Sequence, residues 1–128
     1  MSEEAFKARV VWLVLRGDLE KALEELSAHF GVEKPRVKVG LPKGHSRSLA
    51  VYDPKRKAIF FKNNDAMRNP FVVLHEFYHH LRMFAGKHRG TEKHADRFAL
   101  SFITAYCEVL AGRGIVPRWC ASIASRTD

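Results

Sequence analysis

The chain has 128 residues, of which 46% are hydrophobic and 28% are charged, a balance typical of one globular domain with a modest core. The apolar run at residues 10–15 is too short for a membrane span or a signal peptide, so we expect a single cytoplasmic domain over residues 1–128. The formal charge of +8 excludes no function but favours acidic partners: nucleic acid, an anionic membrane surface or acidic peptides.

Two N-terminal helices are expected within residues 1–31. Residues 6–15 are apolar enough for a buried helix or a buried strand, and periodicity alone leaves both open. The next segment is clearer, because apolar residues repeat at helical spacing between a capping Asp18 and Gly31. These apolar residues are Leu19, Ala22, Leu23, Leu26 and Phe30.

Three short β-like runs follow, at residues 36–39, 48–52 and 58–62. Asp53 and Pro54 mark a turn between the last two runs. We therefore predict an α+β fold in which residues 35–62 form a small antiparallel sheet packed on helices.

A helix is predicted over residues 70–85. Asn69 is a good N-cap, Pro70 suits the first helical position, and Gly86 can end the helix in left-handed geometry.

This helix contains the most informative motif of the chain, the H-E-x-x-H run at residues 75–79. His75 and His79 are one turn apart and lie on one face, so both can bind a single Zn²⁺. Glu76 lies beside them, where a general base would take a proton from a zinc-bound water. His80 falls on the opposite face, which indicates a structural or surface histidine.

A third ligand is expected on a further helix over residues 91–111, because a catalytic zinc needs three protein ligands and one open position. Glu92 and Asp96 lie one turn apart at the start of its inward stripe. Glu92 is predicted to be the third ligand and Asp96 to accept a hydrogen bond from a ligand histidine. In the alternative, Glu92 is only an acid favoured at a helix N-terminus.

H-E-x-x-H at residues 75–79, followed by E-x-x-A-D-x-F-A at 92–99, resembles the gluzincin metallopeptidases. The compact forms are the most similar: the CAAX-prenyl-protease catalytic domain, the ImmA/IrrE-type proteases and the soluble minigluzincins. The resemblance covers residues 48–103 and implies a zincin-like zinc endopeptidase with a strand lining its substrate cleft. Only twelve residues separate His79 from Glu92, and minigluzincins use histidine as third ligand, which keeps His94 and His88 as alternatives.

Two further parts of such an enzyme are expected. An extended substrate would pair with an exposed strand edge beside the zinc, and residues 58–61 are the candidate. An ordinary core strand is the equal alternative. The group that stabilises the oxyanion is expected among Tyr106, His45 and His88.

Residues 115–128 form a C-terminal tail that is unusually apolar for a free terminus. The resemblance suggests that this tail covers the cleft and keeps the enzyme latent. Either Trp119 packs against the body or a Cys120 thiolate occupies the open zinc position. Cys107 and Cys120 are the only cysteines; they fit a reduced compartment without a disulfide framework, with Cys107 as a small buried residue.

Two other functions remain open. Basic residues cluster before and within the expected sheet, which would suit a nucleic-acid-associated protein whose zinc is structural or absent. An interaction module that has lost activity is the other, and the presence of Glu76 argues against it. The lack of glutamine hints at a thermophilic source. The clustered basic residues are Lys34, Arg36, Lys38, Lys43, Arg47, Lys55, Arg56 and Lys57.

Overall fold

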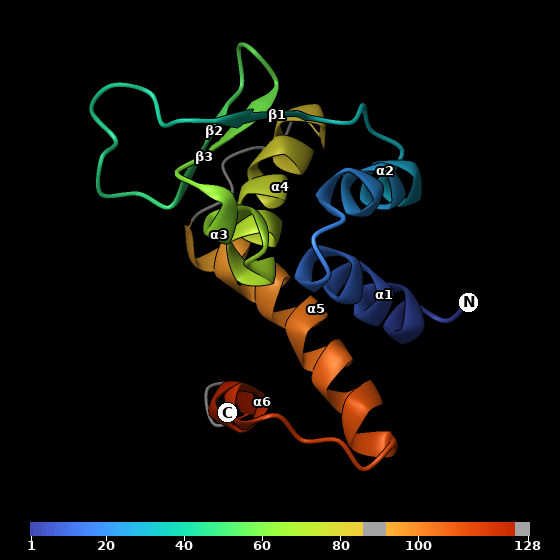
Figure 1. Ribbon diagram of the computed structural model, residues 1–128. Coiled ribbons are helices and arrows are strands. Elements are labelled where there is room, and N and C mark those ends of the chain that lie inside the picture. Colours follow the sequence, from blue (N-terminus) through green and yellow to red (C-terminus); the bar gives the residue numbers. More distant parts are fainter. Residues whose placement is uncertain (86–91, 125–128) are drawn as a thin grey trace.

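The computed structural model describes residues 1–85 and 92–124, which form an α+β fold with one three-stranded sheet (Figure 1). The sheet lies at one end of the molecule and α6 at the other (Figure 1). In chain order the elements are α1 (Glu3–Leu15), α2 (Leu19–Phe30), β1 (Arg36–Val39), β2 (Ala50–Asp53), β3 (Ala58–Phe61), α3 (Asn64–Met67), α4 (Pro70–Ala85), α5 (Glu92–Gly112) and α6 (Arg118–Ala124).

The N-terminal segment is helical throughout, which resolves the choice left open for residues 6–15 in favour of a helix. α1 is apolar on most of its surface because it packs against both α2 and α5. Val10, Val11 and Val14 are fully buried there. α2 ends at Gly31 in left-handed geometry, with φ of 69°.

The sheet is mixed, so the prediction of an antiparallel sheet is wrong. β3 is the central strand; it pairs antiparallel with β2 and parallel with β1. The physical reason is the connection at residues 40–49, which is long enough to carry the chain from one edge of the sheet to the other. β3 is therefore a core strand without a free edge, with Ile59 and Phe61 fully buried. Residues 58–61 are not an exposed substrate edge.

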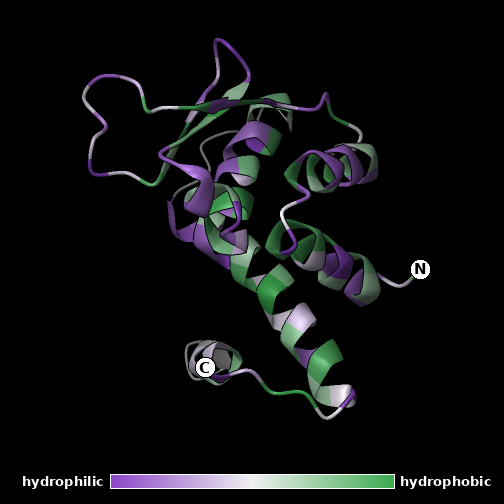
Figure 2. Ribbon diagram, in the orientation of Figure 1, coloured by the Kyte–Doolittle hydropathy of each residue, from purple (hydrophilic) through white to green (hydrophobic). Residues whose placement is uncertain are grey.

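One hydrophobic core joins α1, α2, α4, α5 and the inner face of the sheet. Phe61 from β3, Phe77 from α4 and Phe102 from α5 are its largest buried side chains. In Figure 2 hydrophobic residues recur along these helices and strands, whereas the loops around the sheet are mostly hydrophilic. α4 begins as predicted, because the Asn69 side chain accepts a hydrogen bond from the backbone N–H of Val72 at 3.2 Å.

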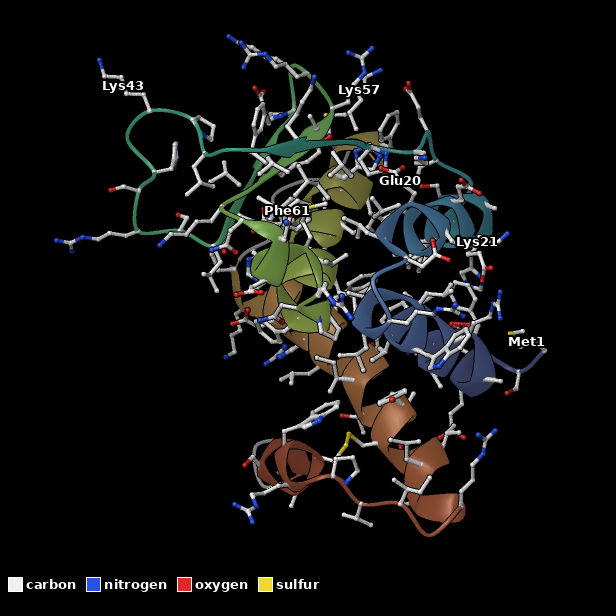
Figure 3. All side chains as sticks on the ribbon, viewed as in Figure 1. Met1, Glu20, Lys21, Lys43, Lys57 and Phe61 are labelled. Atoms are coloured by element: carbon white, nitrogen blue, oxygen red, sulfur yellow. A yellow bond between two sulfur atoms is a disulfide. The ribbon has the colours of Figure 1, made fainter. Side chains whose placement is uncertain are left out.

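α6 packs beside the C-terminal half of α5 (Figure 1). Cys107 and Cys120 form a disulfide between the two helices, visible in Figure 3, with Cα atoms 5.6 Å apart. The expectation of two free cysteines is therefore wrong, as is a Cys120 thiolate ligand. Trp119 stacks on Tyr106 with ring centroids 6.0 Å apart, which confirms that the tail packs through Trp119.

None of the helices in residues 1–85 and 92–124 combines the length and the apolar character needed to cross a membrane.

Candidate metal centre

The middle of α4 and the first turn of α5 bring His75, His79 and Glu92 together. The Nε2 atom of His75 lies 2.6 Å from one carboxylate oxygen of Glu92, and the Nε2 atom of His79 lies 3.1 Å from the other. The ligand atoms of all three side chains lie within 4.8 Å of one another. Two imidazole nitrogens and one carboxylate oxygen are a donor set found at catalytic zinc sites, where a fourth position stays open. The three residues predicted as ligands therefore form a cluster that fits a divalent cation.

Asp96 fixes the orientation of His75. Its Oδ1 lies 2.9 Å from the Nδ1 atom of His75. A carboxylate can only accept, so the Nδ1–H of His75 donates to Asp96 and the Nε2 atom is left pointing at the cluster. Asp96 thus occupies the position expected of it, one helical turn after Glu92.

Glu76 lies against the open edge of the sheet. Burial raises the pKa of its carboxyl to about 7, and the charge of Glu92 acts in the same direction. His75 and the backbone N–H of Tyr52, which donates to this carboxyl, hold the pKa down. Burial also lowers the pKa of His79, which favours the neutral imidazole that metals bind.

A cleft of about 480 Å³ runs between β2 and α4, and Glu76, His79 and Glu92 lie in it. The backbone N–H of Lys62 donates to the carbonyl of Leu49 at 2.9 Å. In an antiparallel ladder only every second residue of a strand exchanges backbone hydrogen bonds with its partner strand, and this bond shows which residues of β2 do so. By this alternation the backbone groups of Ala50 and Tyr52 point away from β3, toward the free edge. The edge strand beside the cluster is therefore β2, where the sequence had suggested β3. The other lining residues are Val51, Pro54, Arg82 and Met83.

His80 is fully buried and structural, as one of the two alternatives predicted. Its Nδ1 atom accepts a hydrogen bond from the Tyr52 hydroxyl at 2.7 Å, and its Nε2–H donates to the carbonyl of Glu33 at 2.6 Å. Burial raises the pKa of Tyr52 to about 12, so this hydroxyl keeps its proton. The pair ties β2 to α4 and so holds the cleft wall. Sequence analysis missed the role of Tyr52, because nothing local links it to a residue 28 positions away.

The other candidate residues lie elsewhere. His94 is exposed on α5 and is not part of the cluster, and His88 lies outside the described residues. Tyr106 is fourteen residues beyond Glu92 on the same helix, about 21 Å along its axis, and His45 is exposed in the β1–β2 connection. Neither Tyr106 nor His45 lines the cleft, so both are wrong as oxyanion-stabilising groups.

The described part of the tail also leaves the cleft uncovered. Residues 115–124 pack near the C-terminal end of α5, whereas the cluster is at its N-terminal end (Figure 1). The prediction that this part of the tail covers the cleft is therefore wrong; residues 125–128 lie outside the described residues.

Comparison of the chain with protein-family models, curated proteins and solved structures gave no match. The geometry of the cluster and its cleft is therefore what bears on function.

Proposed function

We propose that the protein is a zinc-dependent endopeptidase of the gluzincin type. His75, His79 and Glu92 would hold the zinc, and Glu76 would act as general base. The observation that carries this proposal is the approach of Glu92, from a second helix, to both histidines of the motif, at 2.6 and 3.1 Å. The second helix thus supplies the third donor that a catalytic zinc needs in addition to the two histidines of the motif.

Zinc bound at this position would polarise a substrate carbonyl and lower the pKa of water. The proton transfers would be carried out by a residue of the chain. Glu76 accepts a proton from the attacking water and later donates it to the leaving amine, which needs a carboxyl that exchanges protons near neutral pH. Its half-buried position beside His75 and Tyr52 fits that task.

The substrate is proposed to be an extended peptide that pairs with the free edge of β2. The backbone N–H and C=O of Ala50 and the C=O of Tyr52 point to this edge, while the N–H of Tyr52 is donated to Glu76. A peptide bound by these groups would pass directly over the catalytic carboxyl. This arrangement supports peptide bonds as the substrate class, rather than small esters or nucleotides.

A cytoplasmic location is part of the proposal and has to accommodate the disulfide. Disulfides are rare in the cytoplasm of mesophiles but common in intracellular proteins of hyperthermophiles. The thermophilic source suggested by the composition would reconcile the two.

The test is cleavage of a mixed peptide library by protein reconstituted with Zn²⁺, comparing wild type with Glu76→Gln. We expect Glu76→Gln to keep the metal and lose at least about 100-fold in rate, because the amide cannot accept the proton. Glu108→Gln, an exposed change on α5, is the matched control and should cleave like wild type. Cleavage by Glu76→Gln at the wild-type rate would refute the mechanism.

A further inference from the structure

A second hollow, of about 1010 Å³, lies on the face of the sheet away from the helices. It is bounded by β1, the β1–β2 connection and the turn between β2 and β3. Seven lysine and arginine side chains line it, against a single carboxylate, Glu33. Figure 3 shows two of them, Lys43 and Lys57, at the end of the molecule that carries the sheet.

Three of these seven cations are compensated within the protein. Lys34 forms an ion pair with Glu20, Arg56 with Asp53 at 2.8 Å, and Lys57 with Glu33 at 3.1 Å. The other four have no ion-pair partner among the residues that the structure describes. They are Arg36, Lys38, Lys43 and Lys55.

Strand alternation explains why cations gather here. Arg36 and Lys38 pair with Ala58 and Phe60 across the β1–β3 ladder, so their side chains share one face. The intervening Val37 and Ile59 point to the core. Phe60 is only partly buried and lines the hollow, so a flat aromatic ring lies among the cations.

We propose that this outer face of the sheet binds single-stranded nucleic acid. The four uncompensated cations would contact successive phosphates, and Phe60 would stack on a base. Cations along a backbone path combined with an aromatic ring on a sheet face are the two elements of such sites. This function is independent of the proposed peptidase activity, because it uses the outer face of the sheet and not the cleft beside the free edge of β2.

Other polyanions fit less well. An acidic peptide would satisfy the charges but has no base to stack on Phe60. An anionic membrane surface is flat, so its shape does not match a hollow. Duplex DNA would also satisfy the charges, but its bases are paired and stacked inside the helix, so none is available to stack on Phe60.

The test is fluorescence anisotropy with a labelled single-stranded RNA or DNA of about 12 nucleotides and the full chain. Four neutralised phosphates predict that affinity falls about 50-fold between about 50 and 200 mM salt. Chelating metal ions, or the Glu76→Gln substitution, should leave binding unchanged, which separates this proposal from the peptidase.

Two double charge reversals locate the surface. Arg36→Glu with Lys38→Glu alters the strand, and Lys43→Glu with Lys55→Glu alters only the connections, so a folding defect in the first leaves the second informative. Each should weaken binding at least about tenfold and make the salt dependence shallower. The matched control is Arg113→Glu with Arg118→Glu, both exposed at the other end of the molecule, with the same change in net charge. Equal losses in the control would overturn the location.

Phe60→Leu tests the class of partner. It should weaken binding about tenfold without changing the salt dependence, because only the stacking contact is lost. Unchanged binding by Phe60→Leu would overturn nucleic acid as the partner. So would a poly-glutamate chain or an anionic vesicle bound as tightly as the oligonucleotide.

Discussion

His75 and Asp96 are joined by a hydrogen bond of 2.9 Å between Nδ1 and Oδ1 that fixes which imidazole nitrogen faces the candidate metal centre. Asp96 lies one turn beyond Glu92, so α5 supplies both the third donor and the group that orients the first. The two helices therefore determine the site together.

Asp96→Ala should weaken zinc binding about 10- to 100-fold, because His75 loses its orienting acceptor. Zinc should still bind once per chain at saturation. Competition with a chromogenic chelator measures the affinity, with Glu108→Ala on the same helix as control. An unchanged affinity in Asp96→Ala would show that the contact does not tune the site.

Tyr52→Phe should destabilise the protein by about 1–3 kcal/mol, because the buried Nδ1 atom of His80 loses its hydrogen-bond donor. Urea unfolding of the two proteins measures the difference. Tyr106→Phe, which removes a hydroxyl from another partly buried tyrosine and keeps the ring that stacks on Trp119, is the matched control and should unfold like wild type. If Tyr52→Phe unfolds at the wild-type urea concentration, the bond between β2 and α4 contributes nothing to stability.

The two helices of the site were predictable because their signals are local. Asn69 and Pro70 fix the start of α4, and the spacing of four residues places His75 and His79 on one face. Glu92 and Asp96 follow from the same periodicity on α5. Each inference needed only residues within one or two helical turns.

The sheet and the disulfide were not predictable in this way. Which strand lies at the centre depends on where the connection at residues 40–49 returns, and that path is set by packing over the whole domain. Pairing of Cys107 with Cys120 depends on a 5.6 Å approach of two Cα atoms on different helices. Tyr52 and His80 likewise meet only in the folded chain.

The ion pair between α1 and α2 should make stability depend on pH. Arg9 donates two hydrogen bonds to Glu25, at 2.8 and 2.9 Å, and these lower the pKa of Glu25 below its ordinary value of 4.5. The folded protein thus binds this proton less readily than the unfolded chain, so the stabilisation is present above pH 4.5 and is lost as pH falls through the folded pKa.

Glu25→Gln should therefore lower the free energy of unfolding at pH 7 by less than about 1 kcal/mol, since the pair is partly exposed. Near pH 3 the difference from wild type should shrink. Urea midpoints at the two pH values give the comparison, and a difference that is the same at both would contradict the assigned pKa shift.

Reduction of the disulfide should loosen α6 without disturbing the metal centre. α6 packs on α5, and Cys107 is about 22 Å along the helix axis from Glu92. Cys120→Ser should speed hydrogen exchange over residues 115–124 while zinc affinity stays at the wild-type value. Weaker zinc binding in Cys120→Ser would mean that the tail and the site are coupled.

The most direct test of the metal centre is zinc bound per chain after reconstitution and removal of excess metal, in wild type and in Glu92→Ala. We predict about one zinc in wild type and a clear loss in Glu92→Ala, with Glu108→Ala retaining the metal. Zinc kept in full by Glu92→Ala, or none in wild type, would contradict the assignment of His75, His79 and Glu92 as a catalytic zinc site.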